Sequence, residues 1–198
     1  INYRTDSLDV GGVMCPYPIA SETLTNKAYG YSYDEEWAKA IRVTVFHELF
    51  HAVQLQYIDV TTSVNSAFWT EASATANEEI GAPDIDDYFF YVPKFINSTG
   101  ISLYQMTNAY SISVFYLYLY NHVDKHFDRE IWERFSQQQG ASFTDHLKAI
   151  LDKRDLGLDS IYQDFVKKLA LSGPSASTFD KKLWISDDQI RWDSPRPM

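Results

Sequence analysis

The pattern of hydrophobic and polar positions separates the beginning of the chain from a helical remainder. Residues 1–31 mix β-branched and aromatic residues with a Gly-Gly pair, two prolines and turn-forming polar residues, which predicts short strands and loops. The run Ser32–Glu35, SYDE, fits a capping box, in which two side chains satisfy backbone N–H groups at the start of a helix. We expect that helix to extend to about Gln56.

Helical patterns interrupted by glycine and proline recur over most of the remaining sequence. The second helix is expected to stop at Gly81 and Pro83, and Ser142 and Ser160 are suitable N-cap residues for the last two helices. After the first helix, the expected helices span Ala67–Ile80, Asp86–Tyr91, Asn108–His126, Arg129–Gln138, Phe143–Lys153 and Ile161–Leu171.

No internal repeat or low-complexity linker divides the sequence, so we expect one domain over residues 1–198. Its class is α+β and mostly helical. Its expected parts are a β/loop segment (1–31), the helices that carry the candidate chemistry (32–81), a helical subdomain (82–171) and an extended tail (172–198).

The segment Phe46–Gln54, FHELFHAVQ, has the most unusual arrangement of polar positions. Among residues 43–53 the polar ones are Thr44, His47, Glu48 and His51. On a helix these four fall within about 100° of the circumference, and apolar residues occupy all other sides, which predicts a helix buried in the middle of the domain. Because an unpaired buried polar group costs about 1–3 kcal/mol, a buried helix with one polar stripe needs something for that stripe to bind.

His47 and His51 have the spacing of two ligands of one metal ion. Side chains four residues apart on a helix have Cβ atoms about 5–6 Å apart, so both imidazoles can reach one Zn²⁺ at about 2.0–2.1 Å. Glu48, turned about 100° from His47, is placed to take the proton of a zinc-activated water. The alternative is a structural helix whose histidines are satisfied by hydrogen bonds in the core.

A catalytic zinc site needs a third protein ligand, and the segment Phe68–Glu79, FWTEASATANEE, offers the best candidate. Glu71, Thr75 and Glu78 share one helix face, and the small residues around them let this helix approach the motif helix closely. Glu71 follows His51 by 20 residues, which is enough for a loop after the first helix and for the chain to come back to it. Glu78 is a candidate for orienting a ligand histidine, with solvation or direct ligation as the alternatives.

Composition and charge narrow the classes of function. A net charge of −10 without a basic patch argues against nucleic acid as a partner. The chain has 1 cysteine, Cys15, so a metal has to be held by histidine and carboxylate rather than by thiolates. No apolar run approaches the roughly 20 residues that cross a bilayer, so membrane insertion is not expected. No feature of the sequence specifies an oligomeric state.

The two motifs together resemble the gluzincin zinc metallopeptidases, which include thermolysin and the zinc aminopeptidases. That family has H-E-x-x-H followed about 18–20 positions later by a ligand glutamate. HELFHAVQ with WTEASA is most similar to bacterial secreted metallopeptidases, although Ala72 stands where many relatives have glycine. The resemblance implies a zincin-like catalytic domain, a secreted or extracytoplasmic location, and an edge strand within residues 8–31, with KAYGY as the candidate, that pairs with the substrate.

The same resemblance implies roles for individual residues. His47, His51 and Glu71 would be the zinc ligands and Glu48 the general base. The stretch that begins NAYSISVFYLYLY resembles the region in which zinc aminopeptidases place a tyrosine that stabilises the oxyanion, which implies that role for Tyr110.

The remaining histidines are expected to be exposed to solvent. His122 and His126 form a second pair four residues apart, for which we expect a solvated helix end, with a second metal site or an oxyanion role as the alternatives. His146 is expected on the surface near a helix N-terminus.

The sequence therefore predicts a zinc-dependent peptidase that hydrolyses peptide bonds of a peptide or protein substrate. The first alternative is a zinc-binding pseudo-peptidase or partner-recognition domain that no longer cleaves. The second is a metallohydrolase that acts on other acyl bonds, and the third is a structural helical domain without metal. Metal content and turnover on peptides distinguish these possibilities.

Overall fold

The computed structural model describes residues 4–5, 8–9, 33–58, 67–85, 88, 91–98, 109–138 and 140–171. This part of the chain is mostly helical, as the sequence predicted. Its strands are β1 (Arg4–Thr5) and β2 (Leu8–Asp9), which form one short antiparallel pair. Most of the expected β/loop segment, the candidate strand KAYGY, the predicted cap at Ser32 and the tail from Ser172 lie outside the described residues.

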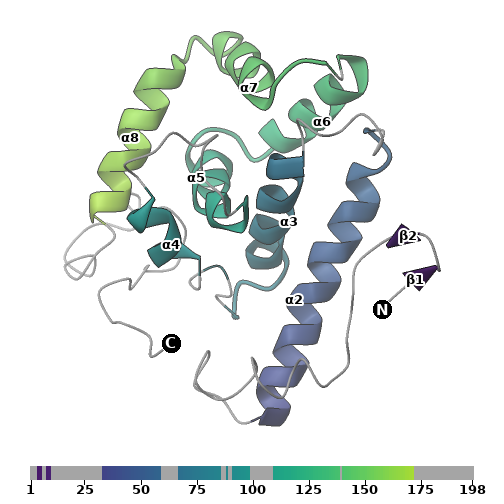
Figure 1. Cartoon of the computed structure of the whole chain (residues 1–198). Helices are drawn as coiled ribbons and strands as arrows, with labels where there is room; N and C mark the ends of the chain where they lie inside the picture. The colour runs from purple at the N-terminus through teal and green to yellow at the C-terminus, as the bar shows by residue number, and fades with distance from the viewer. Residues whose placement is uncertain are drawn as a thin grey trace.

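The described helices divide into a pair that carries the motifs and a group that surrounds the aromatic core. Helix α3 contacts α2 on one side and α5 and η4 on another, and in Figure 1 it lies between α2 and α5. No helix among the described residues is both long enough and apolar enough to cross a membrane. The elements are α2 (Tyr33–Gln54), α3 (Ala67–Gly81), α4 (Val92–Asn97), the 3-10 helix η4 (Ala109–Ile112), α5 (Ser113–His122), α6 (Phe127–Gln137), α7 (Phe143–Asp152) and α8 (Leu158–Leu171).

The helix expected over Asn108–His126 is shorter in the structure than predicted, and it begins as a 3-10 helix rather than an α-helix. Its first turn is the 3-10 helix η4, and α5 ends at His122. The N–H groups of Val123 and Asp124 both bond the carbonyl of Leu119, and the helix ends at this shared acceptor. The predicted bounds are therefore wrong at the C-terminal end.

The sequence did not predict helix α4, and the predicted start of helix α8 is wrong. Helix α4 begins at Val92, so Pro93 lies in its first turn rather than beyond a helix end. Proline is tolerated there because the first N–H groups of a helix have no intrahelical partner. Most of the helix expected over Asp86–Tyr91 falls outside the described residues. Helix α8 begins at Leu158, so Ser160 lies inside it and does not cap it. At α7 the prediction is confirmed, because Ser142 and Asp145 form a capping box.

An aromatic core fills the space between α3 and the helices that follow it. Trp69 of α3 is 0% exposed and stacks on Phe143 with ring centroids 3.6 Å apart. Tyr116 and Phe127 also lie around its indole, with centroids at 5.3 and 6.5 Å. Such large aromatic side chains dominate the burial of apolar surface, which fixes the position of α3. The described core also contains the fully buried aromatic residues Trp132, Tyr88, Tyr118, Phe95, Phe115, Phe135 and Phe165.

Helices α2 and α3 approach each other closely through small residues. Ser73 of α3 is 0% exposed and accepts a hydrogen bond from Gln54 of α2, whereas Ala72 and Ala76 lie in the aromatic core with Trp69. At the end of α3, a Cβ on Gly81 would lie 2.4 Å from Cδ1 of Phe46 on α2, so only glycine fits without a shift. At this contact, α3 and α2 lie close together.

The prediction that the motif helix is buried on all sides is wrong. Leu49 and Val53 of α2 are 60% and 50% exposed, and Leu55 just after the helix is 46% exposed. Helix α3 packs along one side of α2, and the apolar residues of the other side remain accessible. Apolar residues on nearly all sides of a helix in the sequence therefore did not mean that other elements bury the helix on all sides.

Candidate metal site

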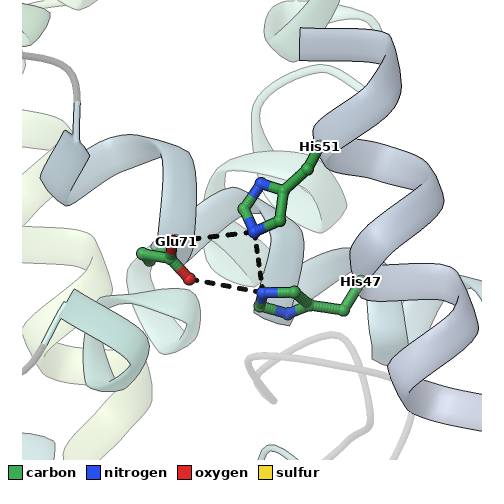
Figure 2. Close-up of side chains that lie close together, drawn as sticks. All are labelled: His47, His51 and Glu71. Carbon is green, nitrogen blue, oxygen red and sulfur yellow. Dashed lines mark hydrogen bonds and ion pairs between the residues drawn. The ribbon is translucent and has the colours of Figure 1, made fainter. Parts of the chain in front are cut away.

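Three side chains from α2 and α3 converge at the centre of the site. His47 and His51 project from successive turns of α2, and Glu71 projects from α3 toward both (Figure 2). The Nε2 atoms of the two histidines are 2.9 Å apart. Glu71 Oε2 lies 3.3 Å from Nε2 of His47, and Glu71 Oε1 lies 3.6 Å from Nε2 of His51. The sequence predicted this set of residues, and the group could hold a metal ion.

The donor set and its spacing fit a zinc ion. Zinc binds histidine nitrogen and carboxylate oxygen at about 2.0–2.2 Å, so two ligand atoms of a tetrahedral site are separated by roughly 3.3–3.5 Å. The observed separations of 2.9, 3.3 and 3.6 Å bracket that range. The Glu71 side chain is 34% exposed, which leaves the site accessible from solvent on that side. Three protein ligands with an accessible fourth position are typical of catalytic rather than structural zinc sites.

The charges around His47 favour a positive charge at the centre of the site. Burial lowers the pKa of His47, but contacts with the Glu71 and Glu78 carboxylates outweigh burial and raise this pKa to about 9. Burial raises the pKa of Glu71, but hydrogen bonds with His47 and His51 prevail and hold this pKa well below its usual range. The carboxylates thus stabilise a proton on His47, and a bound cation would supply the same positive charge.

Each histidine has its other ring nitrogen against a side-chain oxygen. His47 Nδ1 lies 2.6 Å from Glu78 Oε1, and His51 Nδ1 lies 2.7 Å from Gln54 Oε1. Glu78 is 7% exposed, so the suggestion that it is merely solvated is wrong. Its position matches the predicted role of orienting a ligand histidine, as carboxylates commonly do behind metal-bound imidazoles.

Tyr110 lies beside the three converging side chains, and Glu48 is the neighbour of His47 along α2. Glu48 follows His47 on α2 and is partly exposed. The Tyr110 ring lies 6.1 Å from that of His47 between centroids, and Tyr110 is 38% exposed. Burial, followed by the charge of Glu71 and a hydrogen bond with it, raises the pKa of Tyr110 to about 12. Tyr110 therefore keeps its hydroxyl proton at neutral pH and remains a hydrogen-bond donor.

The other histidines lie away from this group. His122 is the last residue of α5 and stacks on Tyr118 with centroids 5.3 Å apart, while the exposed His126 precedes α6. Because they lie on different elements, these two do not form a second pair of ligands on one helix. The prediction that His146 is a surface residue is wrong, since it is 0% exposed and its ring lies 4.3 Å from that of Phe135. His146 is one turn after Phe143 on α7, on the face that packs into the core.

Two residues next to the site were not assigned a role from the sequence. Gln54 is 1% exposed and bonds His51, and Tyr91 stacks on Tyr110 with centroids 5.6 Å apart. The signal for Gln54 was available, because it lies one turn after His51 on the same helix. No local pattern indicates Tyr91, whose contact with Tyr110 depends on how α4 and η4 meet.

Comparison with protein-family models, with curated proteins and with solved structures found no match for this chain.

Proposed function

We propose that this chain is a zinc-dependent peptidase that hydrolyses peptide bonds in a peptide or protein substrate. The observation that carries the proposal is the convergence of His47, His51 and Glu71, whose ligand atoms all lie within 4.8 Å of one another. The H-E-x-x-H pattern on α2 supports it, because the same turn that places the histidines also places Glu48 beside them. The zincin-like fold, membership of the gluzincin family and a secreted location belong to the same proposal.

The proposed chemistry assigns a separate task to each side chain around the ligands. When bound, zinc would polarise the scissile carbonyl and lower the pKa of a water to about 7. Glu48 accepts a proton from the attacking water on its carboxylate and returns it to the leaving amine. Tyr110 donates its hydroxyl hydrogen to the carbonyl oxygen as negative charge develops there. Its raised pKa, about 12, supports this role because the donor keeps its proton at neutral pH.

The decisive experiment separates metal binding from hydrolysis. Glu48→Gln is expected to retain about one zinc per chain, because Glu48 is not a ligand, and to lose hydrolysis of a mixed peptide library. Zinc is measured by elemental analysis and cleavage by mass spectrometry. Glu133→Gln, the same change on α6, is the matched control and is expected to leave both unchanged.

The outcomes also distinguish the alternatives. Cleavage by Glu48→Gln at the wild-type rate would show that the proposed base is wrong. A wild-type chain that binds zinc but leaves every peptide intact would favour the pseudo-peptidase, unless it cleaves other acyl bonds. Folded wild-type protein without affinity for zinc would favour the structural helical domain.

A further inference from the structure

Gln54 links the second histidine of the motif to the helix that carries Glu71. It lies at the end of α2 and is 1% exposed. Its Oε1 is 2.7 Å from His51 Nδ1, and its Nε2 donates to the carbonyl of Thr70 at 3.0 Å and to Ser73 Oγ at 2.9 Å. Both amide hydrogens and the amide oxygen are therefore used inside the protein.

The neighbours of Gln54 fix the direction of these hydrogen bonds. The Thr70 carbonyl can only accept, so the amide nitrogen rather than the oxygen has to face it. Ser73 Oγ donates its own hydrogen to the Trp69 carbonyl at 2.8 Å and accepts from Gln54. A flipped amide would place its oxygen against the Thr70 carbonyl oxygen, which is repulsive. The oxygen of Gln54 thus faces His51.

This direction determines which nitrogen of His51 is available to a metal. Because Gln54 Oε1 accepts, Nδ1 of His51 carries the hydrogen and Nε2 keeps a lone pair. That lone pair faces His47 Nε2 and Glu71, at the centre of the site. The hydrogen-bond chain from Trp69 through Ser73 and Gln54 therefore holds His51 in the tautomer that a metal requires.

The same amide also holds the backbone beside the third ligand. Thr70 immediately precedes Glu71, so the bond from Gln54 to the Thr70 carbonyl joins α2 to α3 next to that ligand. One side chain thus contacts the ring of His51 and the main chain at Glu71. We propose that Gln54 is a positioning residue that sets both the tautomer of His51 and the distance between His51 and Glu71. This inference rests on the metal site of the proposed function, but not on its peptidase step.

The test measures metal binding rather than activity. Gln54→Leu is expected to lower zinc affinity by about 10–100-fold in competition with a chromogenic chelator. It is also expected to change the visible absorption spectrum of the Co²⁺-loaded protein, which reports the geometry of the ligands. Gln56→Leu, the same substitution at an exposed position two residues away, is expected to match wild type in both measurements.

A second variant guards against loss of folding and separates the two effects. Gln54→Glu has nearly the same shape and retains an acceptor for His51, but it cannot donate to the Thr70 carbonyl. It is expected to bind zinc more tightly than Gln54→Leu and more weakly than wild type. A merely structural role for Gln54 would lower the melting temperature and leave the Co²⁺ spectrum of the folded protein unchanged.

The proposal would be overturned by wild-type zinc affinity and an unchanged Co²⁺ spectrum in both Gln54 variants. That result would leave the peptidase proposal standing, since His47, His51, Glu71 and Glu48 would be untouched. Conversely, weakened zinc binding in the Gln54 variants supports the positioning role even if wild-type protein cleaves no peptide. In that case only the peptidase step would be wrong.

Discussion

Helix α3 separates two regions of opposite character. Toward α2, Glu71 and Glu78 meet His47 through polar contacts, and the Glu71 side chain remains 34% exposed. Toward the later helices, Trp69 is 0% exposed and stacks on Phe143. One helix of 15 residues therefore supplies Glu71 to the candidate metal site and Trp69 to the core. Because the two contributions come from different faces, stability and metal binding should respond to different substitutions.

The largest expected effect is on stability, from Trp69→Ala. Removing an indole that is 0% exposed should lower the free energy of unfolding by about 3–5 kcal/mol. The surrounding aromatic side chains lose their contacts with the indole, and a cavity is left in its place. Chemical denaturation monitored by circular dichroism measures the loss. Zinc affinity of the folded fraction should stay close to wild type, since the indole packs on Tyr116, Phe127 and Phe143 on the core side of α3.

Phe68→Ala is the matched control for that substitution. Phe68 is the preceding residue on α3 and is only partly buried, so its removal should cost clearly less. Equal losses from the two variants, or a collapse of zinc affinity in folded Trp69→Ala, would show that the core and the metal site are not separable.

The next largest effects are on metal binding, from the two glutamates on the opposite face. Glu71→Ala removes a ligand and should lower zinc affinity by more than about 100-fold, whereas Glu78→Ala removes a partner of His47 and should cost about 10–100-fold. Competition with a chelator measures both, and Glu133→Ala on α6 is the exposed control. If Glu78→Ala costs as much as Glu71→Ala, the assignment of ligand and orienting residue would have to be revised.

The site could be predicted from the sequence because most of its geometry is local. Residues 47 and 51 are four positions apart on α2, so the helical repeat places them on one face. Residues 71 and 78 are seven positions apart on α3 and share a face for the same reason. Small residues on α3 indicated that the two helices could meet. Gln54 was not assigned because its role depends on Thr70 and Ser73, which only the packing of α3 against α2 brings to it.

The fold could be predicted less completely, and the errors have identifiable causes. His146 was placed on the surface from its residue type, although its position one turn after Phe143 puts it on the buried face of α7. Helical periodicity across residues 108–126 concealed the end of α5 at His122, because the turn after it has no glycine or proline. The apolar residues around α2 indicated burial, but they do not specify which element covers them.

The smallest expected effect tests the two sides of α2. Leu49 is 60% exposed, so Leu49→Lys should change the free energy of unfolding by no more than about 0.5 kcal/mol and leave zinc affinity unchanged. Val43 on the same helix is 6% exposed, and Val43→Lys should be much more destabilising because it buries a charge. Chemical denaturation of both variants provides the comparison. Similar losses would mean that the Leu49 side of α2 is covered in solution, and that the sequence-based interpretation of a helix buried on all sides was correct.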